Sequence, residues 1–264
     1  MKTSFRDLQF GLEFRFLGQF SIRGLGGWQS GPSLKKGGEL LQYLGVYPRR
    51  IATKDELAAA FWPELDPEAV AHRLHLAASG ARGYLRRLLG GPDAIVAVTG
   101  GYAWSINAAV RSDVETFLAL CKNEEPESLE AAIGLYDGEF LAGETADWLQ
   151  PMRVRCAAAY ACALEALAHR AEAARDFPAA LSAGFKLHDA ERGHEGATRL
   201  IMRCFAALGQ RDRAERQYES LCDYLRHRLG VEPTHETTAL ARQLKSGRRV
   251  YGEFAERGDV MMVR

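Results

Sequence analysis

The stretch from Asp66 to Gly90, DPEAVAHRLHLAASGARGYLRRLLG, constrains this chain more than any other. Its apolar residues recur at steps of three and four, which is the spacing of one buried helix face; they are Val70, Leu74, Ala77, Ala78, Ala81, Leu85 and Leu88. We expect the Asp66 side chain to cap the first turn, Pro67 to fit the first helical position and Gly90 to end the helix. The stretch therefore predicts one long amphipathic helix.

The other side of this predicted helix is polar and basic. It carries His72, Arg73, His75, Ser79, Arg82, Arg86 and Arg87. A helix fits the major groove of DNA, where arginine pairs with guanine edges. A solvated helix face has the same composition, however, and Gly80 and Gly83 cost the helix about 1 kcal/mol each relative to alanine. The interpretation of this face therefore depends on the elements around it.

Two shorter helices and a strand hairpin are predicted before the long helix. Residues 12–22 alternate apolar and polar side chains as a hairpin does, and residues 33–47 have helical spacing. The next helix covers residues 54–62, and Thr53 and Glu56 stand at the spacing of a capping box.

A second hairpin is predicted after the long helix, from residues 94–99 and 102–106, with two glycines between them. Three helices with a small terminal hairpin make a winged helix-turn-helix, in which the third helix enters the major groove and the hairpin is the wing. Basic residues on or beside the first two helices are then candidates for phosphate contacts, which give affinity without reading sequence. They are Lys35, Lys36, Arg49, Arg50 and Lys54.

From residue 107 to residue 246 the pattern is almost entirely helical. We expect helices at 112–122, 126–135, 148–175, 177–190, 195–208, 212–229 and 234–245. Ala180 and Ala214 follow similar polar turns and stand 34 residues apart, which is the period of tetratricopeptide (TPR) helix pairs. The predicted fold class is therefore mainly α with small β. A winged helix-turn-helix domain covers residues 1–106, an all-α TPR-like domain covers 107–246, and 247–264 form a tail.

An array of this kind is a scaffold for contacts. Four arginines are candidates for lining its concave surface, where they would meet an acidic partner or the phosphate of an effector: Arg153, Arg155, Arg199 and Arg203. Ordinary solvated or salt-bridged arginines are the alternative.

The distribution of charge and the spacing of the cysteines limit the classes of protein to which this chain can belong. Net charge is zero, but residues 1–100 hold 13 Lys/Arg against 9 Asp/Glu, and residues 101–264 hold 21 against 25. A basic front and an acidic back fit a DNA module joined to a domain that meets proteins or ligands. The five cysteines lack CxxC spacing, and we expect free thiols in a reducing cytoplasm. No apolar run has transmembrane length, so we expect no membrane association.

An enzyme is the first competing class. The stretch GLGGWQSG at residues 24–31 lacks the Lys-Ser/Thr of a phosphate loop and a complete dinucleotide fingerprint. His72 and His75 form an HxxH pair without the further ligands of a zinc site. No nucleophile or paired carboxylates stand in a catalytic context. We therefore expect no enzyme, no cofactor and no metal.

Several stretches resemble the bacterial transcriptional activator domain (BTAD) proteins, a group that includes the antibiotic-pathway regulators abbreviated SARP. LEFRFLGQFSI resembles the family's opening strands, and IATKDELAAAFWPE resembles its second helix. HRLHLAASGARGYLR followed by VTGGYAWSI resembles the recognition helix and wing of its OmpR-like winged helix. SDVETFLAL, LYDGEFLAG with Trp148, and YESLCDYLRHRLGVEPTHETTAL resemble the activator domain. The likeness covers about residues 12–245.

The resemblance implies a sequence-specific DNA-binding regulator, an activator that contacts RNA polymerase at promoters. Carried over position by position, the contacts to double-stranded DNA are made by His72, Arg73, His75, Ser79, Arg82 and Arg86, and Thr99 and Tyr102 belong to the wing. A homodimer and a small-molecule or nucleotide effector of the helical domain stay open. The alternative function is a protein-interaction scaffold that uses the winged helix and the TPR-like array without reading DNA.

Overall fold

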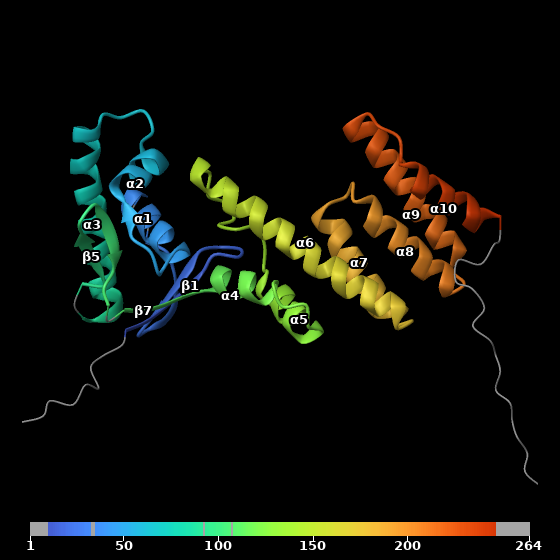
Figure 1. Cartoon of the computed structure of the whole chain (residues 1–264), viewed down its shortest axis with the longest axis horizontal. Helices are drawn as coiled ribbons and strands as arrows, with labels where there is room; N and C mark the ends of the chain where they lie inside the picture. The colour runs from blue at the N-terminus through green and yellow to red at the C-terminus, as the bar shows by residue number, and fades with distance from the viewer. Residues whose placement is uncertain (1–9, 33–34, 92, 107, 247–264) are drawn as a thin grey trace, which may run out of the picture. The chain divides into compact units, whose positions relative to one another are not determined.

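The computed structural model describes residues 10–32, 35–91, 93–106 and 108–246. The chain divides into two compact units, Met1–Tyr160 and Ala161–Arg264. The first contains the helices α1 (Lys35–Val46), α2 (Lys54–Phe61), α3 (Pro67–Leu89), α4 (Asp113–Leu120) and α5 (Pro126–Leu135). Its strands are β1 (Phe10–Arg15), β2 (Ser21–Gly24), β3 (Gly27–Ser30), β4 (Ala52–Thr53), β5 (Ile95–Val98), β6 (Gly101–Trp104) and β7 (Ala108–Ser112). A short 3-10 turn (Asp147–Leu149) leads into α6 (Gln150–Ala173), which begins in the first unit and ends in the second. The second unit continues with α7 (Phe177–Ala190), α8 (Glu195–Ala207), α9 (Arg211–Tyr224) and α10 (His235–Lys245), as Figure 1 shows.

The N-terminal sheet has the strand order β3-β2-β1-β7. β1 and β2 form the predicted hairpin, in which Phe14 pairs with Ile22. The sequence predicts neither β3, which pairs antiparallel with β2, nor β7, which runs parallel to β1. Gly27, the first residue of β3 after the two-residue turn, adopts a φ of 93°, a conformation that favours glycine. The glycine-rich stretch expected as a loop is therefore a tight turn followed by a strand.

The three predicted helices and the second hairpin are present. β5 and β6 are antiparallel, and β4, which directly precedes α2, pairs with β6 to give the order β4-β6-β5. α2 begins with the predicted capping box: the Glu56 N–H donates to the Thr53 hydroxyl at 3.2 Å, and the Thr53 N–H donates to the Glu56 carboxylate at 3.0 Å. These elements confirm the winged helix-turn-helix.

α3 starts and ends within a residue of the predicted bounds, and all seven of its predicted apolar positions are buried. Gly90 ends it at a φ of 62°. The expectation for Asp66 is wrong, because its side chain makes no capping hydrogen bond. Its carbonyl instead accepts the Val70 N–H at 3.0 Å, and the next residue, Pro67, has no N–H that needs a cap.

One apolar core joins the first sheet, the winged helix and the segment that follows β7. Phe14 and Phe16 stack with ring centroids 5.6 Å apart, and Phe140 lies 5.9 Å from Phe16. The Trp104 indole N–H donates to a carbonyl of α1 at 2.9 Å. The buried residues of this core continue as far as Cys156. The domain boundary expected at residue 106 therefore falls inside the first compact unit.

The segment after α5 is held against the loop after β1 by backbone hydrogen bonds. The Leu141 N–H donates to the Phe16 carbonyl at 2.7 Å. Gly18 donates its N–H to the Glu139 carbonyl at 3.1 Å and accepts the Ala142 N–H at 2.9 Å. The LYDGEFLAG stretch is thus a structural tie between the winged helix and the helices that follow it.

The second unit is an antiparallel array in which α7, α8 and α9 pack in sequence. The helices predicted at 126–135 and 177–190 match α5 and α7 at both ends. The helix expected over 212–229 is divided, because α9 ends at Tyr224 and a π-helical turn continues to Leu229.

The turns after α6 and α8 have the same backbone structure, and they stand 34 residues apart. Arg175 (φ 61°) and Gly209 (φ 74°) occupy the same left-handed position. In each turn the next N–H donates to the carbonyl five residues earlier, at 2.9 Å and 2.8 Å. Ala180 and Ala214 are then buried in the helices that follow. The predicted TPR-like repeat is therefore present.

Candidate nucleic-acid interface

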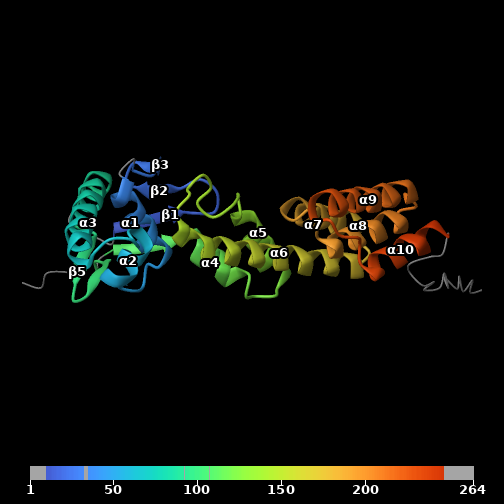
Figure 2. The same cartoon turned by 90° about the horizontal axis from the view of Figure 1, so that it is seen from above.

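α3 presents a polar stripe opposite its buried face. His72, His75, Ser79 and Arg86 recur at helical spacing and are exposed, and Arg73 is exposed beside them. α3 lies at one end of the first unit, with α1 and α2 between it and α4, in both views (Figures 1 and 2). Five of the six predicted contact residues of α3 therefore face solvent.

One apolar residue belongs to the same stripe. Leu76 is 56% exposed and stands between His75 and Ser79 on the exposed side. Leu76 was not among the predicted contacts, although its helical position among polar residues marks it as part of the stripe. An apolar side chain on a groove-facing surface is suited to contact the methyl group of thymine.

The sixth predicted residue, Arg82, is held inside the domain. Its Nε–H donates to the Ile95 carbonyl at 2.9 Å, and its guanidinium lies 5.8 Å from the centre of the Tyr102 ring. Arg82 therefore links the β5–β6 hairpin to α3 through its Nε–H, and its side chain is only partly exposed. Arg86 pairs with Asp93 at 2.9 Å, but more than half of its side chain is exposed. Surface pairs of that kind are weak, so Arg86 stays available.

The hairpin residues differ in exposure. Thr99, in the turn, is exposed, whereas Tyr102 is 6% exposed and pairs with Ala52 of β4. The Tyr102 side chain is therefore closed to the wing contact that the resemblance implies. Lys54, the first residue of α2, is exposed, and its backbone N–H donates to the Gly100 carbonyl at 2.9 Å. The start of α2 and the hairpin turn thus lie side by side.

Three other predicted phosphate contacts take part in surface ion pairs. The pairs are Lys36–Glu39 at 2.8 Å, Arg49–Glu115 at 3.0 Å and Arg50–Glu56 at 3.3 Å. All three cations keep exposed surface, and the Arg49 side chain is 85% exposed. The side chain of Lys35 lies outside the described part of the structure.

Arg153 and Arg155, the first two candidates for a ligand surface, have opposite environments. The Arg153 guanidinium donates at 2.9, 2.8 and 2.7 Å to the carbonyls of Phe140, Leu141 and Glu144, and its side chain is 10% exposed. Arg155 is exposed. Arg153 therefore holds the segment after α5 in place, and Arg155 faces solvent.

The other two candidates join helices of the second unit. Arg203 makes paired hydrogen bonds to the buried Glu172 carboxylate at 2.6 and 2.8 Å. Arg199 donates to the Thr237 hydroxyl at 2.9 Å and lies 4.0 Å from Glu195. Burial alone raises the pKa of Glu195, but hydrogen bonds from two threonines and the nearby Arg199 charge bring it below its usual value.

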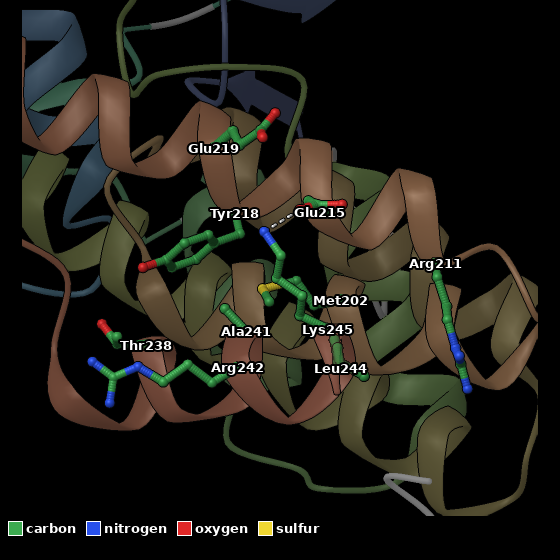
Figure 3. A pocket seen from close by; sticks show the side chains of 10 residues that line it. All are labelled: Met202, Arg211, Glu215, Tyr218, Glu219, Thr238, Ala241, Arg242, Leu244 and Lys245. Carbon is green, nitrogen blue, oxygen red and sulfur yellow. Dashed lines mark ion pairs between the residues drawn. The ribbon is translucent and has the colours of Figure 1, made fainter. Parts of the chain in front are cut away.

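The second unit holds a cavity of about 530 Å³ between α8, α9 and α10, and none of these four arginines lines it (Figure 3). Met202, Ala241 and Leu244 supply apolar lining. Charged residues of both signs surround them: Arg211, Arg242, Lys245, Glu215 and Glu219. Lys245 and Glu215 form an ion pair at 3.5 Å.

Within residues 10–32, 35–91, 93–106 and 108–246, no group of three His, Cys, Asp or Glu side chains is placed to hold a metal ion. Over the same ranges no helix has the length and hydropathy needed to cross a membrane. Burial raises the pKa of the Cys156 thiol to about 12 and that of Cys204 to about 11. These two thiols are therefore protonated and unreactive at neutral pH.

Comparison with known proteins gives a family and a fold. A family model described as bacterial transcriptional activator domain matches residues 113–245, just over half of the 264-residue chain. Among solved structures, Mycobacterium tuberculosis EmbR in complex with a low-affinity phosphopeptide is 20% identical, with a TM-score of 0.70. That match covers 90% of this chain and 65% of EmbR, so this chain spans about 65% of its length. The C-terminal TPR-containing domain of a Plasmodium falciparum FK506-binding protein is 10% identical, with a TM-score of 0.38, over 51% of this chain and 89% of that one. No curated protein sequence matches this chain.

Proposed function

The chain belongs to the bacterial transcriptional activator domain family, and from this premise we propose that it is a sequence-specific DNA-binding regulator of transcription and not an enzyme. The observation that carries this proposal is the exposed polar stripe of α3, on a helix whose other face is fully packed in a winged helix-turn-helix. A well-packed helix keeps its outer face in a fixed orientation, which base recognition requires.

Arg73, His72, His75 and Ser79 make the base contacts in this proposal. Each is exposed, and Arg73 has the planar donor pair that matches the O6 and N7 atoms of guanine. Leu76 adds a contact to a thymine methyl group. Lys54 and Thr99 bind phosphate beside them, because the start of α2 and the hairpin turn are adjacent and exposed.

The chain then activates transcription through contacts with RNA polymerase, a role that the family description supports. A small molecule or nucleotide modulates this activity through the helical unit. What supports such a site is the cavity in Figure 3, with its apolar lining and charged rim. The arginines that sequence analysis named are less suited to it, because Arg153, Arg199 and Arg203 bind groups of the chain itself.

Selection of bound duplexes from a random DNA pool tests the proposal. We expect the full chain to enrich one motif, and we expect its affinity to fall steeply with added salt. Arg73→Ala should lower the preference for that motif over a scrambled duplex by about 1–3 kcal/mol. Arg111→Ala, at an exposed arginine of β7, is the matched control and should leave the preference unchanged.

Circular dichroism of each variant checks that the fold is intact. The absence of any enriched motif would contradict DNA recognition. An enriched motif that survives both Arg73→Ala and Ser79→Ala would contradict the assignment of α3.

A further inference from the structure

The first unit contains a second open surface, a groove of about 490 Å³. It is formed by the end of α1 and the loop after it, by α4, and by the start of α6. Its apolar lining includes Val46, Tyr47, Val114, Leu118 and Met152. Tyr47 and Leu118 are half-buried, so apolar surface is accessible in the groove.

The rim of this groove is strongly cationic. Arg49, Arg50, Lys122 and Arg155 line it, and Glu115 is the one acidic residue among the lining side chains that the structure describes. Arg49 and Arg50 were predicted to contact phosphates and Arg155 to line a ligand surface, whereas no role was predicted for Lys122. The fold brings them together because the end of α1 packs near α4 and the start of α6.

Two of these cations have partners within the described ranges, and two keep their charge unpaired there. Arg49 pairs with Glu115, and Arg50 pairs with Glu56 while its guanidinium lies 4.3 Å from the centre of the Tyr47 ring. Lys122 and Arg155 are exposed and form no ion pair with the described residues. A ligand with two or more negative charges therefore finds two ready partners here.

From this combination we infer that the groove is a docking site for an acidic segment of a protein partner, anchored by an apolar side chain. The apolar lining can accommodate an apolar side chain of a protein segment, whereas a phosphate backbone has no such group to bury. In addition, α1 and α2 lie between α3 and the groove-forming α4 in both views (Figures 1 and 2). A partner in the groove therefore leaves the exposed stripe of α3 open, and the site does not depend on the DNA-binding proposal.

Selection of short random peptides displayed on phage, with the full chain as bait, tests this inference. We expect the enriched peptides to combine an apolar residue such as Leu, Phe or Met with two or more Asp or Glu. The enriched peptide is then synthesised with a fluorescent label, and its Kd is measured by anisotropy. The charge reversal Lys122→Glu with Arg155→Glu should weaken binding at least about tenfold.

A matched control makes the same charge change away from the groove, with Arg170→Glu and Arg192→Glu at two exposed arginines of the second unit. It should change the Kd less than about twofold. Thermal unfolding of both double variants checks that they are folded. We also expect an excess of double-stranded DNA to leave the labelled peptide bound.

Four results would overturn the inference. They are a failure to enrich any peptide, enriched peptides without acidic residues, equal weakening by the control reversal, and displacement of the peptide by DNA. The last would place phosphates in the groove instead of a protein segment.

Discussion

Two arginines near the start of α6 have the same chemistry but different environments. Arg153 and Arg155 are two positions apart, and sequence analysis treats them alike because both are basic residues near the start of a predicted helix. Their difference arises from the segment after α5, which turns back so that three of its carbonyls meet the Arg153 guanidinium. Local sequence does not predict these hydrogen bonds, because they depend on how the segment after α5 packs against the loop after β1.

We predict that Arg153→Met lowers the free energy of unfolding by about 2–3 kcal/mol, because two part-buried carbonyls and one exposed carbonyl lose a charged donor. Arg155→Met, with the same chemical change on an exposed residue, should stay within about 0.5 kcal/mol of the wild type. Urea unfolding followed by tryptophan fluorescence measures both. If the two variants were equally stable, the hydrogen bonds of Arg153 would contribute nothing, and its assignment to a ligand surface would regain support.

At the scale of elements, sequence periodicity predicted what is regular and local. The helices of both units were predicted to within a few residues, because each has an apolar stripe at helical spacing and a recognisable start or end. β3 and β7 were missed for a physical reason. They are short, and each is defined by pairing with another strand, which for β7 lies almost 100 residues away along the chain in β1.

The candidate DNA-binding site was likewise predictable in part from the sequence. The exposed stripe of α3 could be read from its helical spacing, since one face of an amphipathic helix must be outside. The burial of Tyr102 and the bond from Arg82 to Ile95 could not, because both depend on how the hairpin packs against α3. The groove between α1, α4 and α6 was also invisible, because it joins residues from three separate stretches.

The repeated turns of the second unit allow a prediction about backbone strain. Arg175 and Gly209 adopt the same left-handed conformation, and only glycine does so without a steric cost. Arg175→Gly should therefore raise the free energy of unfolding by up to about 1 kcal/mol. Gly209→Ala should lower it by about 1 kcal/mol through conformation alone, because a Cβ at Gly209 would meet no atom within 4 Å.

Thermal unfolding of the two single variants measures these changes. Gly134→Ala is a suitable control, because that glycine lies within α5 at an exposed position where a Cβ meets nothing nearby. It should stabilise the chain by about 0.5–1 kcal/mol through helix propensity. A loss of stability in Arg175→Gly would mean that the arginine side chain contributes more than its backbone strain costs.

At the scale of the whole molecule, the question is where the boundary between independently folding domains lies. Composition and the family likeness suggest a boundary near residue 106, whereas packing extends the first unit to Tyr160. β7 pairs with β1, and Phe140 lies against Phe16. The ring centroids of Trp148 and Tyr43, a residue of α1, are 5.3 Å apart. The helices after the β5–β6 hairpin are therefore part of the core that holds α3 in place.

We predict that a fragment of residues 1–160 unfolds in one cooperative transition and selects the same DNA motif as the full chain. A fragment of residues 1–106 should lack a cooperative transition or aggregate, because it loses the parallel partner of β1 and exposes the aromatic faces that Phe140 and Trp148 cover. Urea unfolding and dispersed amide proton spectra distinguish the two outcomes. If residues 1–106 proved equally stable and equally selective, the segment from β7 to α6 would be an addition to a finished domain, and the boundary predicted at residue 106 would be the correct one.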